Sequence, residues 1–457
     1  MRKNHRRLAI AGTALLGLMF SGSSLAWNLK EAAQPYKGVT INVVGLERPS
    51  YKAAQALTPE FEKETGIHVN WTTFPYESTL KAETLNFVSQ SGQYDVVLSD
   101  VVWPVTFVDA GWVVPMKHFT DNPKLADPAL DLKDFFPVWL ASFTVNDKLY
   151  GLPFDSYAGL LFYNKKMLAD AGFDGPPKTW DELYNYDKKL TNKDKGVYGY
   201  VLQSAHNETQ TADAFARFLW PWGGRFLDIG QKKVMVDSPD SVAGIQFRRK
   251  LVKLMPSGIV SDDHPQVIQM LIQKKAAMVT EWSSFYTTLK QSPIGDDIGV
   301  AVEPKGPKKA ASAFGGFAYM VSAQIPEKKQ NASYLFIQWL TSKEMAKPLI
   351  EKGAVVARRS ADTDPSIQAD NPYLKPMVAT WEHSTVPDWR PQLQCYPQFS
   401  NIVSDWGSRI EQKRLPVKSS LHDMADALQK YMDSSDCWAH ANQPEKYISK
   451  YESKSAQ

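Results

Sequence analysis

Several aromatic and charged side chains follow short apolar runs of this sequence, where the strands of a sheet would end. Aromatic rings cover the flat C–H faces of a ligand, and charged groups make charge-assisted hydrogen bonds to its hydroxyls. This combination of residue types is typical of a site that holds a carbohydrate. The candidate ligand residues are Glu47, Arg48, Tyr76, Asp100, Trp103, Asp155, Tyr157, Trp222, Trp282, Gly316, Phe317 and Arg358.

The same residue types have other uses. An aromatic content of 12% places several tryptophans in any core, and Asp100 can instead cap the helix that follows it. The carboxylates of Asp100 and Asp155 also suit a secreted glycosidase, as acid and as nucleophile or base. The sequence has no His-Glu-x-x-His, Cys-x-x-Cys, Gly-x-Ser-x-Gly or Gly-Lys-Ser/Thr motif. We therefore expect a protein that is not an enzyme and has neither a metal nor a cofactor.

In the first third of the chain, strands alternate with helices. Residues 39–44, 68–74 and 93–98 read as strands, and the helices between them include one that ends at Gly66. This alternation predicts a mostly parallel sheet, whose ligands bind beyond the carboxyl ends of the strands. Those ends carry Glu47, Arg48, Tyr76, Asp100 and Trp103.

A second group of strands follows after residue 151. Residues 151–163 form an apolar run with Asp155 near its start. Residues 276–280 form a strand that leads directly into Trp282. Trp220 and Trp222 belong to a rigid turn, and the sequence leaves open which of them points inward. We expect these positions to face those of the first group of strands.

The chain begins with the pattern of a secretory signal peptide. Residues 1–26 have a basic head, an apolar body of 13 residues and a small-residue end, which predicts cleavage after Ala26 and a periplasmic location. A transmembrane anchor needs about 20 apolar residues, which is more than the 13 of this apolar body, so we do not expect this segment to span a membrane. Without the four basic residues of this segment, 48 Lys and Arg face 49 Asp and Glu, so the formal charge of +3 becomes about −1. This balance gives no indication of nucleic acid as a partner.

The mature length indicates two lobes, since single cores stop growing beyond about 250–300 residues. The sequence contains two cysteines, Cys395 and Cys437. In an oxidising compartment such a pair favours a disulfide, which would stabilise the fold by about 4 kcal/mol. Two buried free thiols are the alternative.

A series of motifs resembles one protein family. The segments GLPFD, YNKKML and AGFDGPPKTWDEL occur between Gly151 and Leu183, and SGQYDVVLSD, DAGWVVPM, AAMVTEW, AFGGFAYMVSA and QWLTSKE occur elsewhere, in the family's order. Together they resemble the family 1 extracellular solute-binding proteins of ABC importers, of the maltose-binding-protein-like carbohydrate type. The resemblance covers the chain from about Val39 to Ser360.

The resemblance implies an α/β, two-lobed periplasmic-binding-protein fold, with lobes of mostly parallel sheet joined by a hinge. It divides the chain into a first lobe of residues 27–152 and 312–353 and a second lobe of residues 153–311 and 354–457. The implied function is capture of a sugar, oligosaccharide or polyol between the lobes by a monomer, and its delivery to a membrane permease. Within the same fold, a phosphorylated polyol, a polyamine or chelated iron is an alternative ligand.

Overall fold

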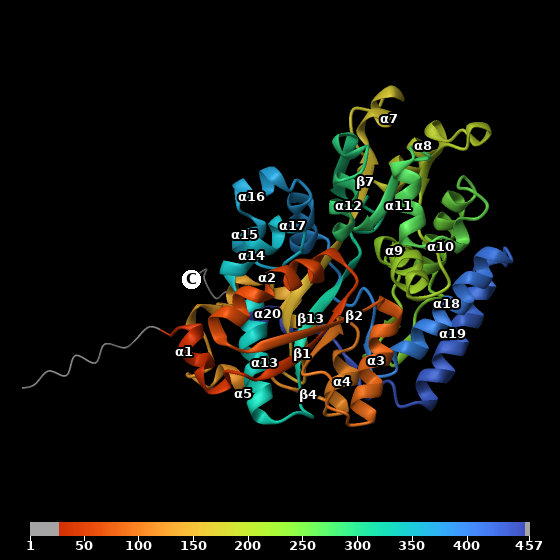
Figure 1. The fold of residues 1–457 in the computed structure, drawn as a ribbon. Helices are drawn as coiled ribbons and strands as arrows, with labels where there is room; N and C mark the ends of the chain where they lie inside the picture. The colour runs from red at the N-terminus through yellow and green to blue at the C-terminus, as the bar shows by residue number, and fades with distance from the viewer. Residues whose placement is uncertain (1–26, 453–457) are drawn as a thin grey trace, which may run out of the picture.

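The computed structural model describes residues 27–452, so the predicted signal peptide and its cleavage after Ala26 lie outside the described residues. Nine strands form one mixed sheet, flanked by helices, that runs through both lobes of the molecule (Figure 1). The main path of the sheet is β2 (His68–Phe74), β1 (Thr40–Leu46), β3 (Val96–Asp100), β13 (Phe314–Ser322), β7 (Leu152–Asn164), β11 (Ala276–Trp282) and β8 (Tyr198–Val201). Two further strands, β4 (Val113–Val114) and β12 (Ile298–Val302), pair with β13 and β7.

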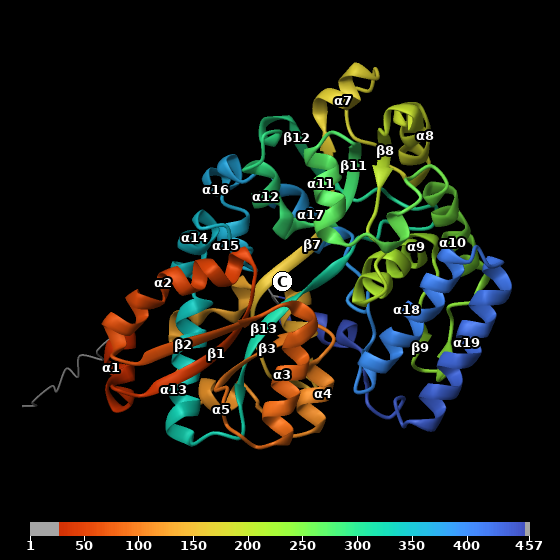
Figure 2. The same ribbon diagram turned by 45° about the vertical axis from the view of Figure 1, so that its right-hand side comes forward.

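Strand β7 joins the two lobes. Its first half pairs with β13, where Tyr157 lies opposite Gly315, and its second half pairs with β11, where Gly159 lies opposite Trp282. Twelve of its 13 residues are buried, because the strand has neighbours on both sides and layers above and below it. Figure 2 shows β7 and β13 passing together between the lobes. The predicted two-lobed α/β fold is confirmed.

The first lobe is built on the parallel strands β2, β1 and β3. Helices α2 (Pro49–Thr65), α3 (Tyr76–Val88) and α13 (Glu327–Leu340) pack around them. Helix α2 ends at Gly66, whose φ of 70° is the left-handed conformation that glycine adopts without cost. Trp339 packs against Phe61 of α2, with ring centroids 5.3 Å apart, and so belongs to the interior of this lobe.

The second lobe is built on the parallel strands β8 and β11, which the antiparallel β7 and β12 extend. Helices α8 (Trp180–Leu190), α10 (Pro239–Val252) and α11 (His264–Ile272) flank these strands. Helices α18 (Tyr396–Gln412) and α19 (Val417–Ser434) pack on each other and beside α9 and α10. The remaining helices are α1 (Leu29–Ala33), α4 (Pro104–Asp109), α5 (Lys117–Thr120), α6 (Pro137–Ser142), α7 (Lys165–Asp170), α9 (Ala216–Leu219), α12 (Tyr286–Lys290), α14 (Lys343–Glu351), α15 (Arg359–Asp362), α16 (Pro365–Asp370), α17 (Leu374–His383) and α20 (Ile448–Tyr451).

The C-terminal region contains a disulfide and contacts both lobes. Cys395 and Cys437 are bonded to each other, with Cα atoms 5.7 Å apart, which confirms the predicted disulfide. Gln392 donates to the backbone oxygens of Val101 and Ser142 in the first lobe. Helix α20 packs against α6 in the same lobe. No helix within residues 27–452 combines the length and the apolar character that a membrane span requires.

Candidate functional site

A pocket of about 360 Å³ lies at the carboxyl end of β3, beside the strands that connect the lobes. Both lobes contribute to its wall, because β3 and α3 belong to the first and α11 and the end of β11 belong to the second. The lining residues are Arg48, Pro75, Tyr76, Glu77, Asp100, Tyr157, Asn207, Glu208, Thr209, Ala212, Asp213, Asp263, His264, Pro265, Trp282, Gly315, Gly316, Phe317 and Arg390.

Seven of the twelve candidate ligand residues line this pocket: Arg48, Tyr76, Asp100, Tyr157, Trp282, Gly316 and Phe317. The pairing of β3 with β13 brings part of this set together, because Asp100 at the end of β3 lies opposite Phe317 of β13. Gly315 allows the close packing of this region, because a Cβ there would lie 3.1 Å from the Trp282 ring and 3.3 Å from Nη2 of Arg390. Their contact with a ligand remains a prediction.

Three candidates from strand ends do not line the pocket. Glu47 is exposed to solvent outside it. Trp103 is buried behind Tyr76, on which it stacks with ring centroids 5.6 Å apart. Asp155 is fully buried and accepts a hydrogen bond of 2.5 Å from Ser50 Oγ. The structure therefore places none of the three on the pocket wall, because Glu47 is exposed to solvent and the other two side chains are buried.

The tryptophans of the predicted turn also lie elsewhere. Trp222 is buried against Phe247 and Phe218, with ring centroids 4.9 and 5.9 Å away. Trp220 donates from Nε1 to the backbone oxygen of Trp389 at 3.2 Å. Both rings are held by the packing of the second lobe, so neither lines the pocket.

Arg358 does not line the pocket either. Its guanidinium is buried and donates to the backbone oxygens of Thr341, Leu130 and Asp131, at 2.7, 2.8 and 2.9 Å. Burial lowers its pKa to about 10, although nearby carboxylates oppose that shift. A cation that satisfies backbone oxygens inside the first lobe does not reach the pocket.

Arg390 lines the pocket and was not predicted from the sequence. Its guanidinium donates to both carboxylate oxygens of Asp100, at 2.7 and 3.1 Å, and to Oε1 of Glu208 at 3.0 Å. Tyr76 donates its hydroxyl to the same Asp100 at 2.7 Å. Burial lowers the pKa of Arg390, but Asp100 and the other anionic neighbours raise it well above its ordinary value. One arginine thus holds a carboxylate of each lobe.

Glu208 completes this group from the second lobe. It accepts from Ser400 Oγ at 2.6 Å and from the hydroxyl of Tyr396, next to the disulfide. Burial raises the pKa of Glu208, and Arg390 opposes that shift. Each oxygen of the carboxylate therefore already has a donor.

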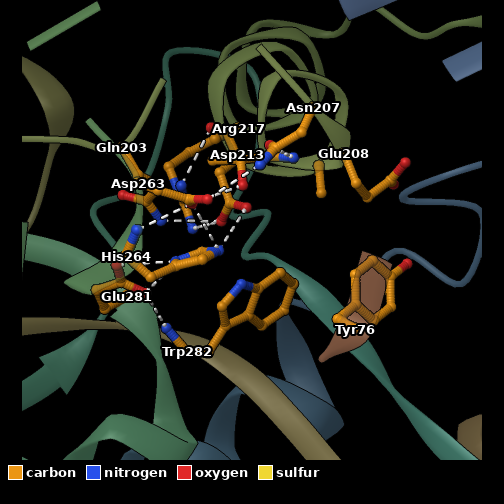
Figure 3. Close-up of polar contacts among 12 residues, drawn as sticks. Tyr76, Gln203, Asn207, Glu208, Asp213, Arg217, Asp263, His264, Glu281 and Trp282 are labelled. Atoms are coloured by element: carbon orange, nitrogen blue, oxygen red, sulfur yellow. Dashed lines mark hydrogen bonds and ion pairs between the residues drawn. The ribbon is translucent and has the colours of Figure 1, made fainter. Parts of the chain in front are cut away.

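A second polar network surrounds His264 at the start of α11 (Figure 3). Its Nδ1 lies 2.9 Å from both carboxylate oxygens of Glu281, and its Nε2 lies 3.8 Å from Asp213 and 3.7 Å from Asp263. Burial lowers the pKa of His264, but Glu281 and then the two aspartates raise it to about 9. The imidazole is therefore protonated at neutral pH and turns Nε2 toward the pocket.

Asp213 comes from a π-helical turn at Gln210–Phe215, an irregular segment of the type found at functional sites. Its Oδ1 accepts from Gln203 at 3.0 Å and from Arg217 at 3.1 Å. Arg217 in turn donates from Nε to Glu303 at 3.1 Å. These bonds fix the Asp213 carboxylate, and its Oδ2 has no hydrogen-bond donor among residues 27–452.

Arg48 lies among the rings of Tyr76, Tyr157 and Phe317, with its guanidinium carbon 5.6 to 5.7 Å from each centroid. It also donates to the Tyr157 hydroxyl at 3.3 Å. Burial raises the pKa of the adjacent Asp155 to about 7, with Ser50 and then Arg48 opposing the shift. The ring faces and the cation form one side of the pocket.

Sequence reasoning missed the charged residues Glu208, Asp213, Asp263, His264 and Arg390. Only Asp263 had a local signal, because Asp263 and Gln266 form a capping box at the start of α11. Arg390 meets Asp100 across 290 residues of sequence, and no local pattern indicates such a contact.

Comparisons with known proteins give consistent results. A Pseudomonas aeruginosa protein named mannitol-binding protein is 24% identical over 417 residues, which cover 85% of this chain and 92% of that protein. Among solved structures, an ABC transporter solute-binding protein from Agrobacterium radiobacter K84 in complex with ribitol is 26% identical, with a TM-score of 0.79, and the match covers 87% of this chain and 99% of that one.

Maltose-bound MalE3 of T. maritima is 25% identical, with a TM-score of 0.77 and coverage of 86% of this chain and 100% of that one. The family described as bacterial extracellular solute-binding protein matches residues 44–347. Since this match spans more than half of the sequence and the fold agrees, the chain belongs to the family of bacterial extracellular solute-binding proteins.

Proposed function

We propose that this protein is the solute-binding subunit of an ABC importer, which captures a sugar or polyol between its lobes and delivers it to a membrane permease. The observation that carries the proposal is the pocket itself, whose ring faces and charged groups come from both lobes. Rings suit the C–H faces of such a ligand, and charged groups suit its hydroxyls. The relatives named for mannitol and solved with ribitol or maltose support the same class of ligand.

The size of the pocket favours a small solute. Ligand pockets range over roughly 300–1,000 Å³, and 360 Å³ is near the lower end. A monosaccharide or a linear polyol is therefore the better candidate than an oligosaccharide.

The proposal includes the cellular setting. The protein acts in the periplasm as a monomer, after removal of residues 1–26, and has no nucleic-acid partner. We keep the predicted lobe boundaries, 27–152 with 312–353 and 153–311 with 354–457, with one change. Residues 390–393 and 441–452 are assigned to the first lobe, because Gln392 and Asn442 bond to its backbone oxygens.

A glycosidase is the second candidate function, and the geometry gives it less support. Such an enzyme needs two carboxyl groups that face the same ligand. Asp100 is held by Arg390, and Asp155 is buried behind the pocket lining. We therefore propose that the protein binds its solute without chemical change.

Two measurements test the proposal. Native mass spectrometry of the purified protein, followed by calorimetry with pentitols, hexitols, hexoses and disaccharides, should identify a ligand that binds with 1:1 stoichiometry. Incubation with oligosaccharides should release no new reducing ends. Absence of binding to the whole panel would count against the proposal, and release of reducing ends would favour the glycosidase.

A further inference from the structure

One oxygen of Asp213 lies at the pocket wall without a donor. Gln203 and Arg217 donate to its Oδ1, at 3.0 and 3.1 Å. Oδ2 accepts no hydrogen bond from residues 27–452, although the side chain is only 1% exposed and lines the pocket. Because a buried acceptor is costly to leave without a donor, a ligand gains affinity by donating to this oxygen.

His264 presents a donor to the same place. Its Nδ1 is bonded to Glu281, so Nε2 remains, 3.8 Å from Oδ2 of Asp213 and 3.7 Å from Oδ1 of Asp263. Both distances are too long for a hydrogen bond. Burial lowers the pKa of His264, but these three carboxylates raise it to about 9, so Nε2 carries a proton at neutral pH. A donor and an acceptor thus face each other, 3.8 Å apart (Figure 3).

Neighbouring side chains hold this pair in place. Arg217, which binds Asp213, also donates to Glu303 at 3.1 Å. The His264 ring stacks on Phe285, with ring centroids 5.6 Å apart. A ligand that binds here therefore meets groups that are already oriented, and little affinity is lost in ordering them.

Resting on the proposed function, we propose that a neutral hydroxyl group of the solute lies between these two atoms, donating to Oδ2 of Asp213 and accepting from Nε2 of His264. An oxygen atom can lie about 2.8 Å from both, because their separation is less than twice that length. A hydroxyl both donates and accepts, whereas an ammonium group cannot accept and an ionised carboxylate or phosphate oxygen cannot donate. The pair therefore selects a hydroxyl over an amine or an acid at this position. Trp282, which lines the same pocket, can cover the C–H groups beside it.

Replacement of one hydroxyl at a time provides the test. Calorimetry should measure D-mannitol, ribitol and every further sugar or polyol that binds, each with its monodeoxy, deoxyfluoro and aminodeoxy derivatives. We expect one position at which loss of the hydroxyl weakens binding about 10- to 100-fold, because a charge-assisted hydrogen bond is lost on each side. Neither fluorine, which cannot donate, nor a protonated amine, which cannot accept, should restore affinity at that position.

Two variants assign that position to the pair. Asp213→Asn keeps Oδ1 for Gln203 and Arg217 but turns a donor toward the ligand. His264→Asn can place its amide nitrogen beside Glu281, in place of Nδ1, but has no counterpart of Nε2. Each variant should bind the parent compound about as weakly as wild type binds the deoxy compound. Removal of this hydroxyl should cost the variants less than about twofold in affinity, whereas removal of any other hydroxyl should cost variants and wild type equally.

The matched control is Asp237→Asn, which changes a carboxylate that pairs with His422 at 3.1 Å outside the pocket lining. This variant should keep the whole wild-type profile. The wild-type series needs no variant, so it decides the inference even where a variant does not fold.

Two results would overturn the inference and leave the proposed function intact. One is equal losses at every position in wild type and in both variants, and the other is an amine or fluorine that fully replaces every hydroxyl in wild type. Absence of binding by every sugar and polyol would instead overturn the proposed function, and the inference with it.

Discussion

At the scale of single residues, Trp282 gives the most direct test of solute contact in the pocket. It ends β11, its backbone N–H donates to Glu281 at 3.0 Å, and its ring lies against Gly315 of β13. In Figure 3 the indole projects away from the network around His264. A ring placed this way can cover one face of a solute without contributing a charge.

We predict that Trp282→Ala weakens solute binding by about 1–3 kcal/mol, because the ligand loses apolar burial and C–H contacts with the ring. Calorimetry with the identified ligand measures the loss. Trp406→Ala, a half-buried tryptophan of α18 outside the pocket lining, is the matched control and should bind normally. Equal affinity in Trp282→Ala and wild type would remove Trp282 from the site.

Asp155 allows a prediction about pH at the same scale. Because burial raises its pKa to about 7 from an ordinary value of 3.8, the native state binds its proton more tightly than the unfolded state does. This group therefore supports folding below about pH 4, and its contribution declines as the pH rises from about 4 to 7. Above that range it opposes folding.

Asp155→Asn, which resembles the protonated acid, should flatten this dependence. Thermal unfolding between pH 4 and pH 8 should show a smaller decline of Tm in the variant than in wild type. Asp187, whose pKa burial also raises to about 7, remains in both proteins, so the difference between them isolates Asp155. Parallel profiles would show that Asp155 does not titrate in this range.

At the scale of elements, the disulfide fixes two helices that support the site. Cys395 immediately precedes α18, and Cys437 follows α19 closely. Tyr396, the residue after Cys395, donates to Glu208 in the pocket wall. The bridge therefore anchors both the helix pair and one donor of the site.

The Cys395→Ser/Cys437→Ser double variant should lose about 4 kcal/mol of unfolding free energy, the value that loop entropy gives for a separation of 42 residues. Urea denaturation measures this change through the midpoint and the slope. Reduced wild-type protein is the control and should unfold at a similar urea concentration. An unchanged midpoint would mean that helix packing alone holds this region.

At the scale of the whole molecule, the pocket has walls in two lobes that β7 and β13 connect. By the lobe assignment proposed above, Arg390 and Asp100 belong to the first lobe, and Glu208, Asp213 and His264 belong to the second. A solute can contact both walls only when the lobes are close together. A ligand shifts such an equilibrium by its difference in affinity for the two states, and a change from 1:99 to 99:1 needs about 5.5 kcal/mol.

We predict that solute closes the lobes and reduces the radius of gyration. X-ray scattering with and without saturating ligand measures the effect. Arg390→Ala should reduce closure at equal occupancy, because it removes the contact with Glu208 between the lobes. An unchanged radius in fully occupied protein would contradict closure by a hinge.

The sequence alone determined the local elements and the family. Helix α2 and its end at Gly66, the strands β1, β2 and β3, and the pairing of Cys395 with Cys437 followed from periodicity, glycine placement and composition. Strand ends of a parallel sheet lie along one edge, so Arg48, Tyr76 and Asp100 could be placed together before the fold was known. These inferences depend on backbone geometry, which nearby residues control.

Only the tertiary structure decided which side chains meet. Trp222 and Arg358 had suitable types and positions, but packing buries Trp222 against Phe247 and the Arg358 guanidinium against backbone oxygens of the first lobe. Arg390 and Asp213 became part of the site because distant segments fold against each other, and 290 residues separate Arg390 from Asp100. Side-chain direction depends on the neighbours that remote parts of the chain supply, and a single sequence does not reveal those neighbours.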